Sequence, residues 1–106
     1  MPVLGTSTFR VRPGMTQGFL ANVTTAKKIL ERLGGRVRVV NRMVGTDAPC
    51  TVVVVESVDW KAYGELQSKL QTDSEWQAFI AKAILNNRDP DADLIGTSLG
   101  ADVPIG

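Results

Sequence analysis

Four aromatic side chains at helical spacing form the first group of residues that could bind a ligand. They are Trp60, Tyr63, Trp76 and Phe79. Indole and phenol rings combine a large apolar surface with one polar atom, and such surfaces line pockets for flat apolar molecules. Aromatic residues at this spacing also pack helices onto sheets, and this is the more common outcome. A ligand-binding role therefore stands beside core packing as an alternative.

A second group combines three arginines with one glutamate. Its members are Arg10, Arg38, Arg42 and Glu56. Guanidinium groups bind carboxylates or enolates through paired hydrogen bonds. Alternation along the strand puts Glu56 on the same side as Val52 and Val54. There it lies beside an apolar surface, where a carboxylate could act as a general base. The alternative is a set of ion pairs at the surface or at a dimer interface.

The composition excludes several kinds of catalytic centre. Histidine is absent and cysteine occurs once, as Cys50. This excludes serine–histidine and cysteine–histidine catalysis and histidine-ligated haem or iron, and it disfavours a zinc site. The aspartate-rich run from Asp89 to Asp93 resembles a calcium loop, but Leu94 and Gly100 stand where such a loop needs glycine and glutamate. We expect neither a metal nor a cofactor.

Length and charge narrow the remaining classes. The 106 residues fit a single domain over residues 1–106. A net charge of +1 gives no electrostatic basis for binding nucleic acid or a membrane surface. No apolar stretch reaches the roughly 18 residues of a membrane span, and the N-terminus lacks the pattern of a signal peptide. A single cysteine permits no intrachain disulfide. We expect a cytoplasmic protein.

The first half of the chain predicts a strand, a helix and another strand. Residues 5–12 alternate and form the first strand, which ends at the turn Pro13–Gly14. The helix begins with Thr16 as its N-cap, repeats apolar residues three and four apart, and ends at Gly34–Gly35. Residues 36–44 form a strand with charges at alternate positions, which is typical of an edge strand.

The segment from Cys50 to Trp60 includes four successive valines and predicts a strand buried on both faces. The short loop 45–49 makes it a hairpin with the preceding strand. Two helices follow, of which the first is capped by Asp59 and the second begins after the break at residues 72–74. Residues 86–90 end the second of these helices.

A short fourth strand over residues 93–99 completes the order β-α-β-β-α-α-β. This order predicts a ferredoxin-like α+β fold, with an antiparallel four-stranded sheet and the helices on one face. Because the valine-rich strand is apolar on both sides, we expect a second copy to cover the other face, so that a homodimer forms a dimeric α+β barrel. The apolar tail from Gly100 to Gly106 is expected to dock, and a partner subunit is one place for it.

The whole pattern resembles the dimeric α+β barrel superfamily, and within it the NIPSNAP-like and antibiotic-biosynthesis-monooxygenase-like small proteins. The carrying residues are the apolar strand ending in Glu56-Ser57, the helix begun by Asp59-Trp60, and Asp73-Ser74-Glu75-Trp76 opening the next helix. The resemblance covers approximately Phe9 to Leu99. The absence of histidine departs from the haem-binding members and from several enzymatic ones, which disfavours those activities.

The resemblance implies a cofactor-independent oxygenase acting on a small aromatic or polyketide-like molecule. Such enzymes orient a phenolic substrate with Asn, Trp and Tyr groups in an apolar pocket. In this hypothesis the catalytic residues are Tyr63, Asn41 and Glu56, and the substrate-binding residues are Trp60, Trp76, Arg10 and Arg42. The alternative is a non-catalytic small-molecule-binding or interaction module whose dimer is the functional unit. A closed cavity holding Tyr63 or Asn41 favours the enzyme, whereas filling of that space by Trp76, Phe79 and Ile80 favours the module.

Overall fold

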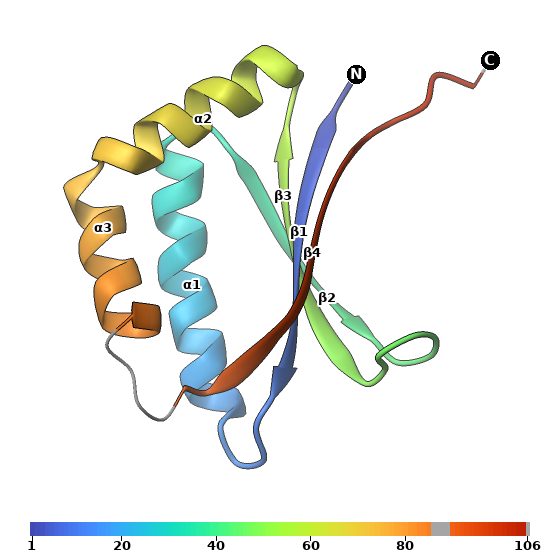
Figure 1. Cartoon of the computed structure of the whole chain (residues 1–106), viewed down its shortest axis with the longest axis vertical. Helices are drawn as coiled ribbons and strands as arrows, with labels where there is room; N and C mark the ends of the chain where they lie inside the picture. The colour runs from blue at the N-terminus through green and yellow to red at the C-terminus, as the bar shows by residue number, and fades with distance from the viewer. Residues whose placement is uncertain (86–89, 106) are drawn as a thin grey trace.

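The computed structural model describes residues 1–85 and 90–105 of the chain. One antiparallel four-stranded sheet carries the helices on one side (Figure 1). In chain order the elements are β1 (Val3–Val11), α1 (Thr16–Arg32), β2 (Arg36–Arg42), β3 (Cys50–Ser57), α2 (Trp60–Thr72), α3 (Ser74–Ile80), the π-helical turn η1 (Ala81–Leu85) and β4 (Ala92–Ala101). The predicted ferredoxin-like α+β fold and its element order are confirmed.

The strands lie in the order β2-β3-β1-β4, so β2 and β4 form the two edges of the sheet. The edge position predicted for β2 is therefore confirmed, as is its hairpin with β3. β3 is paired on both sides, with β1 and with β2. This interior position explains why its sequence is the most apolar of the four strands.

The main core lies between the sheet and the helices. Leu30 of α1 and Leu66 of α2 are buried against Val37 of β2. The partly buried side chains that pack around them are Leu33, Val53, Val55, Leu70 and Trp76. Gly35 links α1 to β2 beneath this cluster, where a Cβ atom would lie 3.2 Å from Cδ2 of Leu66. Glycine at this position therefore allows the close approach of helix and sheet.

The other side of the sheet, which we call the open face, carries no helix in the described parts of the chain (Figure 1). Cys50, Val52 and Val54 of β3 point to this side, where Leu4 and Ile95 pack against them. The register places four residues of β2 on the same side: Arg36, Arg38, Val40 and Arg42. β3 is thus apolar on both faces, as predicted. Within the single chain, its three buried open-face residues are already only 6–8% exposed.

The helix ends obey capping rules, with one correction. The predicted N-cap at Thr16 is wrong, because Met15 occupies the N-cap position without a side-chain hydrogen bond and Thr16 is the first helical residue. Gly34, with φ of 108°, ends α1 as expected. Asp59 caps α2 by accepting a hydrogen bond from the backbone N–H of Ala62 at 2.7 Å. These caps set the directions in which the helices leave the sheet.

All four strands differ in their bounds from the prediction. β1 runs over Val3–Val11 rather than 5–12, and β3 ends at Ser57 rather than at Trp60. β2 ends at Arg42, so Met43 and Val44 lie in the hairpin loop, where they are 73% and 88% exposed. β4 is longer than predicted and runs over Ala92–Ala101. Residues 86–89, within the segment predicted to end the last helix, lie outside the described residues.

Candidate functional site

The structure divides the predicted site residues between the two ends of β3. Asn41 pairs with Thr51 near the beginning of β3. Trp60 and Tyr63 belong to the first turn of α2, which follows Ser57 at the end of β3. Six residues of extended strand separate Thr51 from Ser57, which corresponds to about 20 Å. The chain therefore does not bring Asn41 together with the Trp60–Tyr63 pair.

The aromatic residues of the helices occupy two different environments. Trp60 is 52% exposed and meets Tyr63 edge-on, with ring centroids 6.0 Å apart. Trp76 packs into the core cluster of Leu30, Val37 and Leu66, and its ring lies 5.6 Å from that of Phe79. Trp76 thus contributes to the core, and the space between α3 and the sheet is filled there. Trp60 lies at the surface.

A shallow pocket of about 180 Å³ lies beside the β2–β3 hairpin, and we call it the hairpin pocket. Its lining residues are Val11, Asn41, Met43, Pro49, Cys50 and Thr51. The Thr51 hydroxyl donates a hydrogen bond of 3.0 Å to Oδ1 of Asn41. This contact orients the amide and leaves its nitrogen available as a donor toward a ligand. The lining combines one oriented amide with apolar walls, and it includes no carboxylate.

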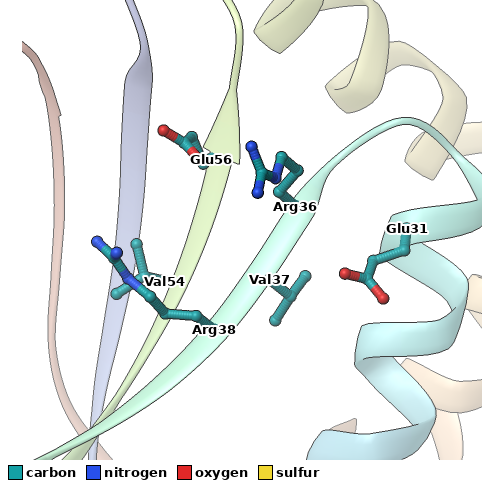
Figure 2. A pocket seen from close by; sticks show the side chains of 6 residues that line it. All are labelled: Glu31, Arg36, Val37, Arg38, Val54 and Glu56. Atoms are coloured by element: carbon teal, nitrogen blue, oxygen red, sulfur yellow. The ribbon is translucent and has the colours of Figure 1, made fainter.

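A second hollow of about 160 Å³ lies at the outer edge of β2, and we call it the edge pocket. Its lining residues are Glu31, Arg36, Val37, Arg38, Val54 and Glu56. Figure 2 shows Arg38 and Glu56 extending over the same side of the sheet, while Glu31 of α1 lies on the other side of β2. Arg36 and Glu56 are directly opposite in the register. Among the described residues, no ion pair within 4.0 Å involves Arg36, Arg38 or Glu56.

Two further arginines reach the open face at the hairpin end. Phe9 contacts Phe19 of α1, with ring centroids 5.4 Å apart, so alternation turns Arg10 to the opposite side of the sheet. Arg42 pairs with Cys50 on β3 and donates a hydrogen bond of 3.3 Å to the carbonyl of Thr46. Arg10, Arg38 and Arg42 thus share one face with Glu56.

In the predicted aspartate-rich turn, Asp93 forms a salt bridge and Asp91 accepts hydrogen bonds. Arg12 forms a salt bridge of 2.8 Å with Asp93, and its guanidinium lowers the pKa of that carboxyl. The Asp91 carboxylate accepts a hydrogen bond of 3.3 Å from the Asn22 side chain, while Asp89 lies outside the described residues. The described residues contain no cluster of three potential metal ligands. No helix among them has the length and apolarity needed to cross a membrane.

Several pocket residues could not be found from sequence patterns alone. Arg36 is the cross-strand neighbour of Glu56, and only the hairpin register reveals this. Val11 comes from β1 and Met43 from the hairpin loop, and the two segments meet only at the hairpin pocket. The one available signal was alternation, which placed Asn41 on the same side as Val37 and Val39.

The fold has clear counterparts among solved structures. A NIPSNAP domain protein of Burkholderia xenovorans is 20% identical, with a TM-score of 0.69 over 97% of this chain and 94% of that chain. A DABB family protein of Mesorhizobium loti with a ferredoxin-like fold is 16% identical, with a TM-score of 0.63 over 99% of this chain and 98% of that chain. A candidate antibiotic biosynthesis monooxygenase of Bordetella bronchiseptica is 16% identical, with a TM-score of 0.61 over 97% of this chain and 98% of that chain.

These likenesses confirm at the level of fold the resemblance drawn from the sequence. No protein family matches the chain by sequence, and no curated protein matches it significantly. The chain is a ferredoxin-like α+β domain with the architecture of NIPSNAP, DABB and monooxygenase-like proteins. At identities this low the likeness defines a fold and leaves the activity to the site.

Proposed function

We propose that the protein is a homodimeric small-molecule-binding protein that uses the open face as its dimer interface. One observation carries this proposal: no helix of the described residues covers the open face, yet apolar side chains remain exposed there and beside it. Val40 on this face is 44% exposed. In the tail that follows β4, Val103 is 75% and Ile105 is 91% exposed. Exposed apolar surface next to a sheet face is typical of an interaction site.

The tail supports a second copy as the occupant of this face. The backbone N–H of Asp102 donates to the carbonyl of Pro2 at 3.1 Å, which fixes the start of the tail at the end of the sheet. Beyond that point the chain turns to the side away from the helices (Figure 1). A symmetric partner on the open face would cover Val40 and receive the tail of the other protomer.

Two adjacent valines of β2 provide a matched test of the dimer. Val39 and Val40 are 40% and 44% exposed, but alternation points them to opposite faces. We expect Val40→Lys to raise the dimer dissociation constant at least about tenfold, because an unpaired ammonium would be buried in the interface. Val39→Lys should leave it unchanged. Sedimentation equilibrium measures both, and a wild-type chain that stays monomeric at high micromolar concentration contradicts the proposal.

We propose the hairpin pocket as the ligand site, because it combines an oriented amide with apolar walls. Its volume of about 180 Å³ is enough for a molecule with one aromatic ring, whose oxygen atom would accept a hydrogen bond from the Asn41 amide. A thermal-shift screen of aromatic acids and quinones would identify ligands. Asn41→Leu should then remove the shift produced by any hit, while Tyr63→Phe, at the opposite end of β3, should preserve it. Loss of binding in the Tyr63→Phe variant alone would show that the ligand binds at α2 instead.

We also propose a cytoplasmic location for the protein. Its single cysteine, Cys50, is a free thiol, which is consistent with a reducing compartment.

The second candidate is a cofactor-independent oxygenase, favoured by the likeness to the Bordetella bronchiseptica protein. Here Asn41 would orient a phenolate in the hairpin pocket. Arg10 and Arg42 extend from the opposite face of the sheet and do not line this pocket, so the Asn41 amide would be the group that stabilises the phenolate oxygen. Oxygen uptake in the presence of a thermal-shift hit distinguishes this reaction from simple binding. Oxygen uptake that disappears in the Asn41→Leu variant supports the oxygenase. Ligand binding without oxygen uptake supports a non-catalytic binding protein.

A further inference from the structure

The open face carries more positive charge than its own carboxylates can neutralise. Arg12 and Asp93 form a salt bridge, so they compensate each other. The other charged strand residues on this side are Arg10, Arg36, Arg38, Arg42 and Glu56. Four guanidinium groups thus stand against one carboxylate, and this excess is concentrated on one face of a chain whose net charge is only +1.

Dimerisation through this face would concentrate the excess. Whichever way two copies are turned about their two-fold axis, both sets of arginines approach a single interface. Like charges repel more strongly where water is displaced, and a guanidinium that is desolvated without a partner is costly. A dimer of this kind needs a source of negative charge other than Glu56.

The edge pocket has the features of a site for such a charge. Arg36 and Arg38 line it from alternate positions of the exposed edge strand, together with the carboxylates of Glu31 and Glu56. Among the described residues, neither carboxylate forms an ion pair with Arg36 or Arg38, so both guanidinium groups retain donors for an anion. In Figure 2 the side chains of Arg38 and Glu56 extend over the sheet beside Val54. The volume of about 160 Å³ is sufficient for a small oxyanion. Guanidinium groups bind carboxylate and phosphate oxygens with paired hydrogen bonds.

We propose that the edge pocket binds a small oxyanion, a carboxylate or phosphate group, through Arg36 and Arg38, and that this anion stabilises the dimer. This inference rests on the proposed homodimer. It names a ligand for the dimer and a way in which the concentration of that ligand would regulate dimerisation. An anion that binds the dimer more tightly than the monomer shifts the association equilibrium by mass action. The strength of dimerisation then follows the oxyanion concentration.

Sedimentation equilibrium in inorganic phosphate and in sodium chloride of equal ionic strength tests the proposal. Equal ionic strength removes the general screening of charge, which both salts provide alike. When phosphate is present at about ten times its dissociation constant from the dimer, each of the two edge pockets contributes a factor of up to about ten. We therefore expect a dimer dissociation constant that is lower in phosphate by about tenfold to a hundredfold, depending on how weakly the monomer binds phosphate. Acetate in a further sample shows whether a carboxylate can replace phosphate. Benzoate adds an aromatic ring to the carboxylate, so a stronger effect of benzoate than of acetate would indicate that the oxyanion is part of a larger ligand.

Charge-removing variants make the test specific. Arg38→Gln should abolish the response to phosphate and strengthen the dimer in chloride, because it removes a repulsive charge from each protomer. Glu56→Gln should enlarge the response to phosphate, because it removes one of the two carboxylates that line the pocket. Lys28→Gln removes the same charge as Arg38→Gln from an exposed position on α1 and should change neither quantity. Far-ultraviolet circular dichroism confirms that each variant is folded.

The outcomes separate the two proposals. A wild-type dimer of equal strength in both salts, with Arg38→Gln behaving like Lys28→Gln, overturns the oxyanion site and leaves the dimer intact. A response that Lys28→Gln reduces as much as Arg38→Gln reveals a general charge effect and also overturns the site. A monomer under every condition overturns both the dimer and the inference.

Discussion

The two faces of the sheet bury the valines of β3 in different ways. On the helix side, Leu30 of α1 and Leu66 of α2 close over the sheet. On the open face, the valines pack with Leu4 of β1 and Ile95 of β4, which belong to the same sheet. Only the helix side therefore joins layers of the fold to each other. The stability of the single chain depends mainly on that side, and the open face is the surface we propose for association.

The largest expected effect tests this division directly. Leu66 is 3% exposed at the centre of the helix-side core, so Leu66→Ala should lower the free energy of unfolding by about 2–5 kcal/mol. Leu4→Ala makes the same deletion on the open face, where the side chain is only partly buried, and should cost less than half as much. Urea unfolding at a concentration that keeps the chain monomeric measures both. Equal losses would mean that the open face supports the folded chain as strongly as the helices do.

The same division explains what the sequence could predict. Periodicity identified the elements and assigned residues to faces, because alternation and helical spacing are local properties. It therefore placed Glu56 with Val52 and Val54, and it marked β2 as an edge strand. Position along the sheet is not local. That Asn41 and Tyr63 lie at opposite ends of β3 follows from the pairing of Asn41 with Thr51.

Other features depended on details that a pattern does not contain. The N-cap of α1 is Met15, one residue before the predicted Thr16, and helix ends commonly shift by a residue. Trp60 and Trp76 have the same residue type and similar predicted surroundings. Only the tertiary packing of α3 distinguishes the partly buried ring of Trp76 from the exposed ring of Trp60.

A smaller effect concerns the contact that joins the helices within the helix-side layer. Arg32, at the end of α1, bonds Asp73 at 2.9 Å and Glu75 at 3.0 Å. Asp73 also caps α3 by accepting a hydrogen bond from the backbone N–H of Trp76. That backbone hydrogen bond, and then Arg32, lower the pKa of the Asp73 carboxyl below its ordinary value of 3.8.

The sign of the pH effect follows from this lowered pKa. The folded chain favours the ionised carboxyl, so the stabilisation is complete above pH 3.8 and disappears as the pH falls through the lower folded-state pKa. Asp73→Asn retains a good capping residue but cannot ionise. We expect it to flatten the loss of stability below pH 4 in urea titrations. Asp59→Asn is the matched control at the α2 cap, where no arginine bond accompanies the cap among the described contacts. An equal flattening there would exclude a special role for Arg32.

The smallest expected effect compares two glycines within helices. Gly64 of α2 has open space where a Cβ would stand, so Gly64→Ala should raise the free energy of unfolding by about 0.5–1 kcal/mol. At Gly18 of α1 the same Cβ would lie 2.8 Å from Oδ2 of Asp91, next to the start of β4. Gly18→Ala should therefore raise the free energy of unfolding less than Gly64→Ala does, or lower it, because Asp91 must move and its hydrogen bond from Asn22 is lost.

A double variant tests this explanation. In an Asp91→Ala background, Gly18→Ala should stabilise the chain as much as Gly64→Ala does, since the crowding atom is gone. Thermal unfolding of the four single and double variants measures this coupling. Additive effects would show that α1 does not depend on its contact with the beginning of β4.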